Sequence, residues 1–295
     1  MKVFLAGATG YIGSAVADAL RGAGHQVSGL ARSDAAATRL TGMGVETVRG
    51  DFADPASVAR AARAADAVVS AASANVPATD TAAVRAVLDA LRGSGKPFVY
   101  TSGIWAYGDT GGRVVTEDTP PNPAALAAWR PAIDREVLQS AADKVRSVVI
   151  QPGVVYGGGG GIPAQFVETA RRDGAARFVG TGENRWTVVH LEDLAELYVR
   201  ALEHAPAGTL LIAVAGPSVR VADLARAASE GAGAGDKVVA WPVAEARQKL
   251  GAYADALALD QQASSRRAEE LLGWKPFRVG ILDDLRQGSY AGTRV

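Results

Sequence analysis

In the first half of the chain, short apolar runs alternate with longer segments in which apolar residues recur at helical spacing. The first apolar run, Lys2 to Ala6, has the composition of a buried parallel strand. Ile12, Val16 and Leu20 follow at the spacing of one helix face, and Gly24 ends that pattern. The alternation predicts an α/β fold, a Rossmann-type doubly wound parallel sheet with helices on both faces.

The same alternation continues to about residue 150. Two segments rich in Ala and Arg, 55–65 and 82–92, keep helical periodicity, so we interpret them as outer helices of βαβ units rather than as disorder. Further strands are predicted at 26–30, 46–49, 67–70, 97–101 and 145–150.

Glycines recur at every third position directly after the first predicted strand. Gly7 would let the strand turn sharply, Gly10 would let backbone approach a phosphate, and Gly13 would let the helix lie close to the sheet. Backbone N–H groups at such a helix start attract a pyrophosphate, although a tight turn could also need glycines without a ligand. The residues expected to bind a dinucleotide here are Gly7, Thr9, Gly10, Tyr11, Ile12 and Gly13.

The residues after the second predicted strand bear on cofactor choice. An acidic residue there would bind the ribose 2′-hydroxyl of NAD, but the chain has Arg32 and Ser33, with Asp34 one step beyond. The planar guanidinium of Arg32 suits a 2′-phosphate, and Ser33 adds a hydroxyl donor. The sequence therefore favours NADP(H), while a solvated surface arginine is the alternative that leaves NAD(H) open.

Two further segments are candidates for contacts with the adenine ring and with the middle of the cofactor. Asp51 could accept a hydrogen bond from the adenine amino group while Phe52 lines the ring. Equally, Asp51 or Asp54 could cap the helix that begins around Pro55. Small residues after the fourth predicted strand leave room for a ligand against the backbone, and these are Ala71, Ala72 and Ser73.

Composition narrows the function classes. Of 295 residues, 31 are Lys or Arg and 31 are Asp or Glu, so the balance of charge favours neither nucleic acid nor an anionic membrane as partner. The absence of cysteine excludes disulfides and thiolate chemistry, and the three distant histidines have no zinc spacing, so no metal is expected. There is no signal-peptide layout or membrane-length apolar run, which predicts a cytoplasmic protein.

The order of motifs along the chain is more specific than any one of them. The glycine turn and Asp51 are followed by Ser102-x-x-x-x-Tyr107-Gly108, Pro152-Gly153-x-x-Tyr156-Gly157, a Val-His-x-x-Asp segment at 189–193 and Leu-Gly-Trp-x-Pro at 272–276. From residue 1 to about 285 the chain resembles the extended short-chain dehydrogenase/reductase superfamily, the NAD-dependent epimerase/dehydratase group. The resemblance implies further cofactor contacts by Thr101, Pro152, Gly153 and Val155.

That resemblance fails at the catalytic residues. The family uses a Ser or Thr together with a Tyr-x-x-x-Lys helix, in which the tyrosine transfers the proton. Here the Ser/Thr position falls on Gly103, with Ser102 one residue early, and the Tyr-x-x-x-Lys window runs from Trp129 to Ile133. Neither an indole nor an isoleucine can act as an acid near neutral pH. The pattern resembles atypical branches of the superfamily.

Other residues must then supply the chemistry. Tyr107 and Ser102 are the catalytic candidates, with water as an alternative proton source; the Tyr107-Gly108 pair could instead only shape its loop. We expect a structural role for His190 and Asp193. The Gly157–Gly161 run could be a lid or only a linker. Substrate contacts are expected from Gly103, Trp105, Trp129, Tyr156 and Trp186, although each tryptophan could simply fill core.

The resemblance also implies a division into two lobes. Residues 1–155, with about 186–204, are assigned to an NADP-binding Rossmann domain, and about 156–185 with 205–295 to a smaller α/β substrate lobe. The leading hypothesis is an NAD(P)-dependent oxidoreductase that reduces a carbonyl, imine or conjugated double bond of a small apolar or aromatic molecule. The alternatives are a nucleotide-sugar epimerase or dehydratase and a non-catalytic NADP-binding sensor. The expected partner is a small-molecule substrate, and a homodimer is left open.

Overall fold

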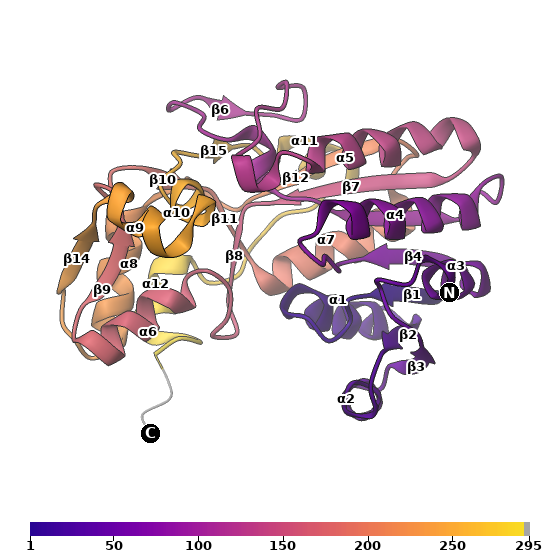
Figure 1. The fold of residues 1–295 in the computed structure, drawn as a ribbon, viewed down its shortest axis with the longest axis horizontal. Helices are drawn as coiled ribbons and strands as arrows, with labels where there is room; N and C mark the ends of the chain where they lie inside the picture. Colours follow the sequence, from indigo (N-terminus) through magenta and orange to yellow (C-terminus); the bar gives the residue numbers. More distant parts are fainter. Residues whose placement is uncertain (292–295) are drawn as a thin grey trace.

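A seven-stranded parallel sheet forms the larger of two lobes in the computed structural model, which describes residues 1–291 (Figure 1). The strand order is β12-β7-β5-β4-β1-β2-β3, so the chain builds outward from β1 in one direction and then in the other. The carboxyl ends of β1 and β4 flank the point where this order reverses, which is where ligands bind in doubly wound sheets. The strands are β1 (Lys2–Ala6), β2 (Gln26–Ala31), β3 (Glu46–Arg49), β4 (Ala67–Ser70), β5 (Pro97–Thr101), β7 (Arg146–Pro152) and β12 (Thr209–Ala213).

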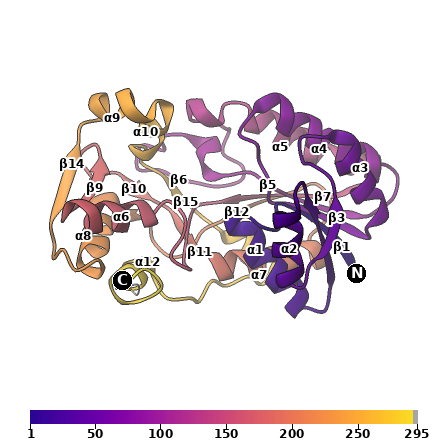
Figure 2. The same ribbon diagram turned by 60° about the horizontal axis from the view of Figure 1, so that its bottom comes forward.

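Helices cover both faces of this sheet, which explains why its strands read as continuous apolar runs (Figure 2). Val3 and Leu5 pack with helices α1 (Tyr11–Gly22), α2 (Asp34–Gly42) and α7 (Leu191–His204) on one face. Phe4 and Phe98 pack on the other face with helices α3 (Pro55–Ala64), α4 (Pro77–Leu91) and α5 (Arg130–Gln139). The doubly wound α/β fold predicted from the pattern is confirmed.

The smaller lobe has its own core. Phe166 and Trp186 stack with ring centroids 5.7 Å apart, and Leu224 and Leu285 are fully buried beside them. Its helices are α6 (Ala164–Asp173), α8 (Val221–Gly231), α9 (Val243–Leu250), α10 (Ala252–Leu257) and α12 (Ile281–Gln287). Its strands are β9 (Ala176–Val179), β10 (Arg185–Trp186), β13 (Val219–Arg220) and β14 (Val238–Trp241).

Short elements connect the lobes. Strand β8 (Val154–Tyr156) pairs in parallel with β11 (Val188–His190), and β6 (Val114–Val115) pairs with β15 (Gln262–Ala263). The remaining elements are the 3₁₀ turns η1 (Ile104–Tyr107), η2 (Ala125–Ala127) and η3 (Ser140–Asp143), and helix α11 (Arg266–Leu272). Within residues 1–291, no helix is both long and apolar enough to cross a bilayer.

The lobe boundaries differ from the sequence-based assignment at three places. Residues 209–213 form β12, the strand that pairs with β7 at the edge of the large sheet, although they were assigned to the smaller lobe. Helix α11 and Trp274 also bury their side chains against the sheet domain, with α1 and α7. Trp186, by contrast, belongs to the core of the smaller lobe. The long C-terminal segment therefore crosses between lobes more than once, which the linear pattern does not reveal.

Candidate functional site

The glycine turn follows β1 at the switch point of the sheet, and two of its glycines are required by packing alone. Gly7 has a φ of +86°, and a Cβ there would lie 2.8 Å from the backbone carbonyl of Ala71. A Cβ on Gly13 would lie 2.0 Å from the Gly7 carbonyl oxygen. These two glycines allow β1, β4 and α1 to approach closely, whether or not a ligand binds.

Gly10 is different, because the fold does not require a glycine there. Its φ of −79° suits any residue, and a Cβ would meet only the Gly7 carbonyl oxygen, at 3.2 Å. Helix α1 begins at this residue with no side-chain cap, whereas Ser33 and Asp54 cap the next two helices. The first N–H groups of α1 are therefore available to an anion, and Gly10 carries no side chain that would block a pyrophosphate.

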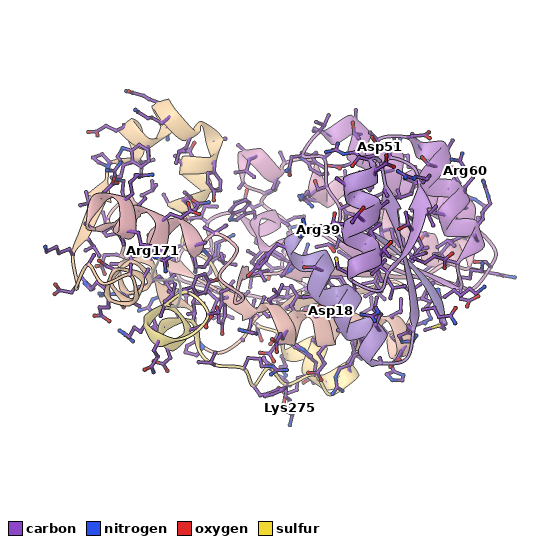
Figure 3. The ribbon with its side chains drawn as sticks, turned by 90° about the horizontal axis from the view of Figure 1, so that it is seen from below. Asp18, Arg39, Asp51, Arg60, Arg171 and Lys275 are labelled. Carbon is purple, nitrogen blue, oxygen red and sulfur yellow. The ribbon has the colours of Figure 1, made fainter. Side chains whose placement is uncertain are left out.

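Arg32 is exposed and lies between the end of β2 and the start of α2. Ser33 is the N-cap of α2, where its hydroxyl accepts a hydrogen bond from the Ala36 N–H at 3.2 Å. Figure 3 shows Arg39 on α2 and Asp18 on α1 in the same lobe, while Arg171 belongs to the other lobe. The position of Arg32 suits a contact with the adenosine ribose.

The two aspartates that follow β3, Asp51 and Asp54, make different hydrogen bonds. Asp54 caps α3 by accepting hydrogen bonds from the N–H groups of Ala56 and Ser57, at 3.0 and 3.2 Å. Asp51 does not cap that helix; it accepts one bond from the Ala53 N–H at 2.9 Å and stays partly exposed (Figure 3). Phe52 packs at the edge of the core beneath α3. Asp51 therefore keeps the placement expected of an adenine contact.

A cavity of about 270 Å³ opens beyond the carboxyl ends of β5 and β7, directly beside the glycine turn. Its walls are largely apolar, and Arg130 is the one charged side chain among the described residues that line it. Residues from the start of α1, from the segment after β5 and from the smaller lobe meet there. The cavity brings together the predicted residues Tyr11, Ile12, Ser102, Gly103, Trp105, Pro152, Gly153 and Val155.

Three aromatic residues expected to contact the substrate do not line this cavity. Trp129 packs against the core beneath α5, and the Arg130 guanidinium lies over its ring, 4.6 Å from the centroid. Trp186 is buried in the smaller lobe, where its Nε1 donates to the Leu257 carbonyl at 3.3 Å. Tyr156 donates its hydroxyl to the Val279 carbonyl at 2.8 Å. These side chains fill the core instead of contacting a substrate. Arg130, and not Trp129, lines this wall of the cavity.

Tyr107 also lies outside this cavity. It lines a second, smaller cavity of about 210 Å³ together with Glu117 and Asp134. Burial raises the pKa of its hydroxyl well above the usual range, and the Glu117 and Asp134 carboxylates add to the shift. A neutral hydroxyl remote from the larger cavity fits the loop-shaping alternative, and our catalytic prediction for Tyr107 is not supported by its position.

Ser102 lies where the two cavities approach each other. It lines the larger cavity, and its Oγ donates a hydrogen bond to Asp134 Oδ2 at 2.8 Å. Gln151 Nε2 donates to the same oxygen at 2.9 Å. Asp134 is only 5% exposed, and within the described residues its Oδ1 has no hydrogen-bond partner. Burial raises the pKa of Asp134 to about 6, against the opposing effects of Ser102, Gln151 and Arg130.

Sequence reasoning missed both Asp134 and Arg130. Asp134 lies on the buried face of α5 between Ile133 and Val137, so a carboxylate within an apolar helical stripe was the available signal. Arg130 Nη2 donates to Ser73 Oγ at 3.2 Å, and Ser73 in turn donates to Asp80 Oδ2 at 2.8 Å. This chain of contacts places the predicted Ser73 beside the cavity entrance rather than in its wall.

The Gly157–Gly161 run is anchored along its length. Tyr11 donates its hydroxyl to the Gly157 carbonyl at 2.7 Å. The Tyr290 hydroxyl accepts from the Gly157 N–H at 2.9 Å and donates to the Gly160 carbonyl at 2.6 Å. Because Gly161 lines the larger cavity, these bonds fix one of its walls to the cofactor turn.

The remaining motif residues make contacts within the fold. His190 caps α7, with Nδ1 accepting from the Glu192 N–H at 3.2 Å. Asp193 accepts from the N–H groups of Phe277 and Arg278, which ties the C-terminal segment to α7. Thr101, at the end of β5, shares a 2.6 Å hydrogen bond with the Tyr198 hydroxyl. The backbone of Ala71 and Ala72, directly after β4, lies in close contact with Gly7.

Comparisons with known proteins agree with this architecture. The NAD dependent epimerase/dehydratase family matches residues 3–213. A 2-alkyl-3-oxoalkanoate reductase of Stenotrophomonas maltophilia is 29% identical over 69% of this chain and 66% of its own length. A 3-diazoavenalumate denitrifying reductase of a Streptomyces species is 29% identical over 97% of this chain and 99% of its own.

Solved structures share the fold. The UDP-glucose 4-epimerase of Thermus thermophilus, in complex with NAD, superposes with a TM-score of 0.81 at 22% identity, over the whole of both chains. The architecture, the switch-point cavity and the matched residues lead to one conclusion: the chain belongs to the NAD dependent epimerase/dehydratase family.

Proposed function

We propose that the chain is an NAD(P)H-dependent oxidoreductase that reduces a carbonyl, imine or related double bond of a small organic acid. The observation that carries this proposal is the cavity itself, which places the Ser102 hydroxyl beside an uncapped cofactor turn within apolar walls. Such a site positions a hydride acceptor and provides one hydroxyl donor for its heteroatom. The two reductase-named relatives support the same reaction class.

The walls of the cavity indicate the substrate class. Ile104, Trp105 and Ile162 favour an apolar or aromatic body, and Arg130 adds one cation. Both reductase names denote carboxylate-containing compounds, an oxoalkanoate and a diazoavenalumate. Arg130 is held between Trp129 and Ser73, so its guanidinium is already oriented when a carboxylate enters.

A nucleotide-sugar epimerase or dehydratase is the second candidate, and the fold neighbours favour it. Two features weigh against it. The chain has no tyrosine and lysine in the window from Trp129 to Ile133, and apolar walls offer few partners to a sugar. We therefore rank it below a reductase.

The test is turnover by the purified chain with NADPH and NADH against a defined panel. The panel contains 3-oxoalkanoates of increasing chain length, an aryl 3-oxo acid, an arenediazonium carboxylate, the matching methyl esters and UDP-glucose. We expect cofactor oxidation with the acids, a higher KM for the esters because Arg130 loses its partner, and none with UDP-glucose. Epimerised UDP-glucose would support the second candidate, and bound cofactor without turnover would support a non-catalytic sensor.

A further inference from the structure

We infer that Ser102 and Asp134 form a two-residue proton relay that connects the substrate cavity to a second cavity and replaces the missing tyrosine and lysine. This inference rests on the proposed reductase function. In it, Ser102 is the catalytic residue that touches the substrate oxygen. Asp134 acts through Ser102 and is a positioning residue that also stores the proton.

The positions of Ser102 and Asp134 are the first reason for inferring a relay. Ser102 lines the larger cavity, and Asp134 lines the smaller one, on the opposite side of their 2.8 Å hydrogen bond. Both side chains are more than nine-tenths buried. The pair is thus a continuous hydroxyl–carboxyl path between two spaces that the protein otherwise separates.

Buried polar atoms without a hydrogen-bond partner beside this pair are the second reason for inferring a relay. Asp134 Oδ1 and Gln151 Oε1 are both buried without a partner among residues 1–291. A buried carboxylate oxygen without a donor in the protein needs a proton of its own or a water molecule, and a proton relay uses both. Water entering the smaller cavity, which Asp134 and Gln151 both line, is the natural proton source for this oxygen.

Electrostatics agree with that geometry. Burial raises the pKa of Asp134 to about 6, so both protonation states are populated near neutral pH. The groups that face it are the donors Ser102 and Gln151, the Arg130 cation one turn earlier on α5, and Tyr100. Across the smaller cavity lie Tyr107, Glu117 and Arg135. A general acid works best when its pKa lies close to the working pH.

The proton balance is complete. NAD(P)H, when bound, would supply the hydride for the carbonyl carbon of the substrate. The Ser102 Oγ–H bond breaks as its proton moves to the carbonyl oxygen, and the proton of the Asp134 carboxylic acid moves to Ser102 Oγ. Asp134 is left as a carboxylate, which then takes a proton from water in the smaller cavity. One proton is consumed for each alcohol formed.

The first test measures the carboxyl group directly, without cofactor or substrate. Protein labelled with ¹³C at the aspartate carboxyl carbon is titrated by NMR from pH 3 to 9. We expect one resonance with a midpoint near 6 that disappears in Asp134→Asn and moves to higher pH in Ser102→Ala. A midpoint of Asp134 near the ordinary value of about 4, or one that is indifferent to Ser102→Ala, would overturn the relay.

The second test uses turnover of the 3-oxoalkanoate probe. In the reductive direction kcat should fall as pH rises through about 6, and Asp134→Asn should remove this dependence and lower kcat while KM stays unchanged. Ser102→Ala should lower kcat by about 10²–10⁴-fold, and the double variant should be no slower than Ser102→Ala. Asp284→Asn is the matched control, a buried carboxylate that binds Ser289 in the other lobe; it should leave the pH profile intact.

Failure of the relay and failure of the proposed function give different results. Active wild-type enzyme whose pH profile survives in a folded Asp134→Asn variant would overturn the relay and leave the reductase function standing. Wild-type enzyme that turns over no probe with either cofactor would overturn the function and, with it, the catalytic role of the pair.

Discussion

In the glycine turn, two glycines are required by the packing of the fold, and a third leaves room for the approach of a ligand. Gly7 and Gly13 are enclosed by backbone: a side chain on Gly7 would clash with Ala71 and Ala72 after β4, and one on Gly13 would force α1 away from Gly7. Gly10 has an ordinary backbone conformation and space beside it. Packing therefore constrains Gly10 less than Gly7 and Gly13, because a Cβ there needs only a slight shift of the Gly7 carbonyl, and the missing side chain leaves room for a ligand.

Gly10→Val tests this distinction. A valine fits the backbone after a small shift but fills the space expected to hold the pyrophosphate. We expect a folded protein with an unchanged melting curve and no measurable NADPH binding by calorimetry. Gly13→Ala is the control, and we expect it to destabilise the fold because its Cβ would lie 2.0 Å from the Gly7 carbonyl oxygen. Full NADPH affinity in Gly10→Val would refute the placement of the phosphates.

Cofactor preference depends on one exposed side chain. If Arg32 pairs with a 2′-phosphate, NADPH should bind more tightly than NADH, and Arg32→Ala should remove most of that difference. A charge-assisted hydrogen bond contributes about 1.5–3 kcal/mol, or about 10- to 150-fold in Kd. Calorimetry with both cofactors measures it, with Arg172→Ala, an exposed ion-pair partner of Asp173, as the control. Equal Kd values for the two cofactors in the unmutated protein would contradict the assignment.

At the scale of elements, the apolar runs predicted the central strands well. Strands buried on both faces have to be continuously apolar, and the runs at 2–6, 67–70 and 97–101 match the observed strands residue for residue. The predicted strand 46–49 also matches β3, but this is an edge strand and not an apolar run. The other edge strand, β12, is apolar like the central strands, yet its neighbour in the sheet could not be read from sequence, because pairing with β7 depends on a long crossover through the smaller lobe.

The active-site helix shows why the site was harder to predict than the fold. Successive residues on a helix differ by about 100° in direction, so an error of one residue changes the face that a side chain presents. The motif spacing directed attention to Trp129, whereas the structure turns Arg130 to the cavity and Trp129 to the core. Asp134 was missed because its signal, a carboxylate between Ile133 and Val137 on an apolar helix face, depends on knowing which face of the helix is buried.

The anchored glycine run offers a prediction at this scale. Tyr290→Phe deletes the hydroxyl that bonds both the Gly157 N–H and the Gly160 carbonyl. We expect a loss of about 1–3 kcal/mol in unfolding free energy, since both groups lose a partner. Hydrogen exchange at the Gly157 amide should accelerate. Tyr253→Phe, which deletes a hydroxyl bonded to Gln165, is the control and should leave that amide protected; unchanged exchange in Tyr290→Phe would show that the run is held by other contacts.

For the whole molecule, the two lobes contribute different halves of one site. The sheet domain supplies the glycine turn, Ser102 and Arg130. The smaller lobe supplies Ile162 and supports Trp105 through Tyr253, whose ring lies 6.0 Å away in an edge-on contact. Relatives with the same sheet domain and different smaller lobes would then share hydride chemistry and differ in substrate. This division fits the similarity of the chain both to a reductase-named relative and to an epimerase with the same fold.

The most direct test of the central claim is transfer of deuterium from cofactor to product. The wild-type protein is incubated with NADPH deuterated at either face of C4 and with the best 3-oxoalkanoate of the panel, and the product is examined by mass spectrometry. We predict that deuterium from one face alone appears at the former carbonyl carbon, and that Ser102→Ala slows its appearance by about 10²–10⁴-fold without changing the face. Product without deuterium from either face, or undiminished transfer by Ser102→Ala, would contradict the account.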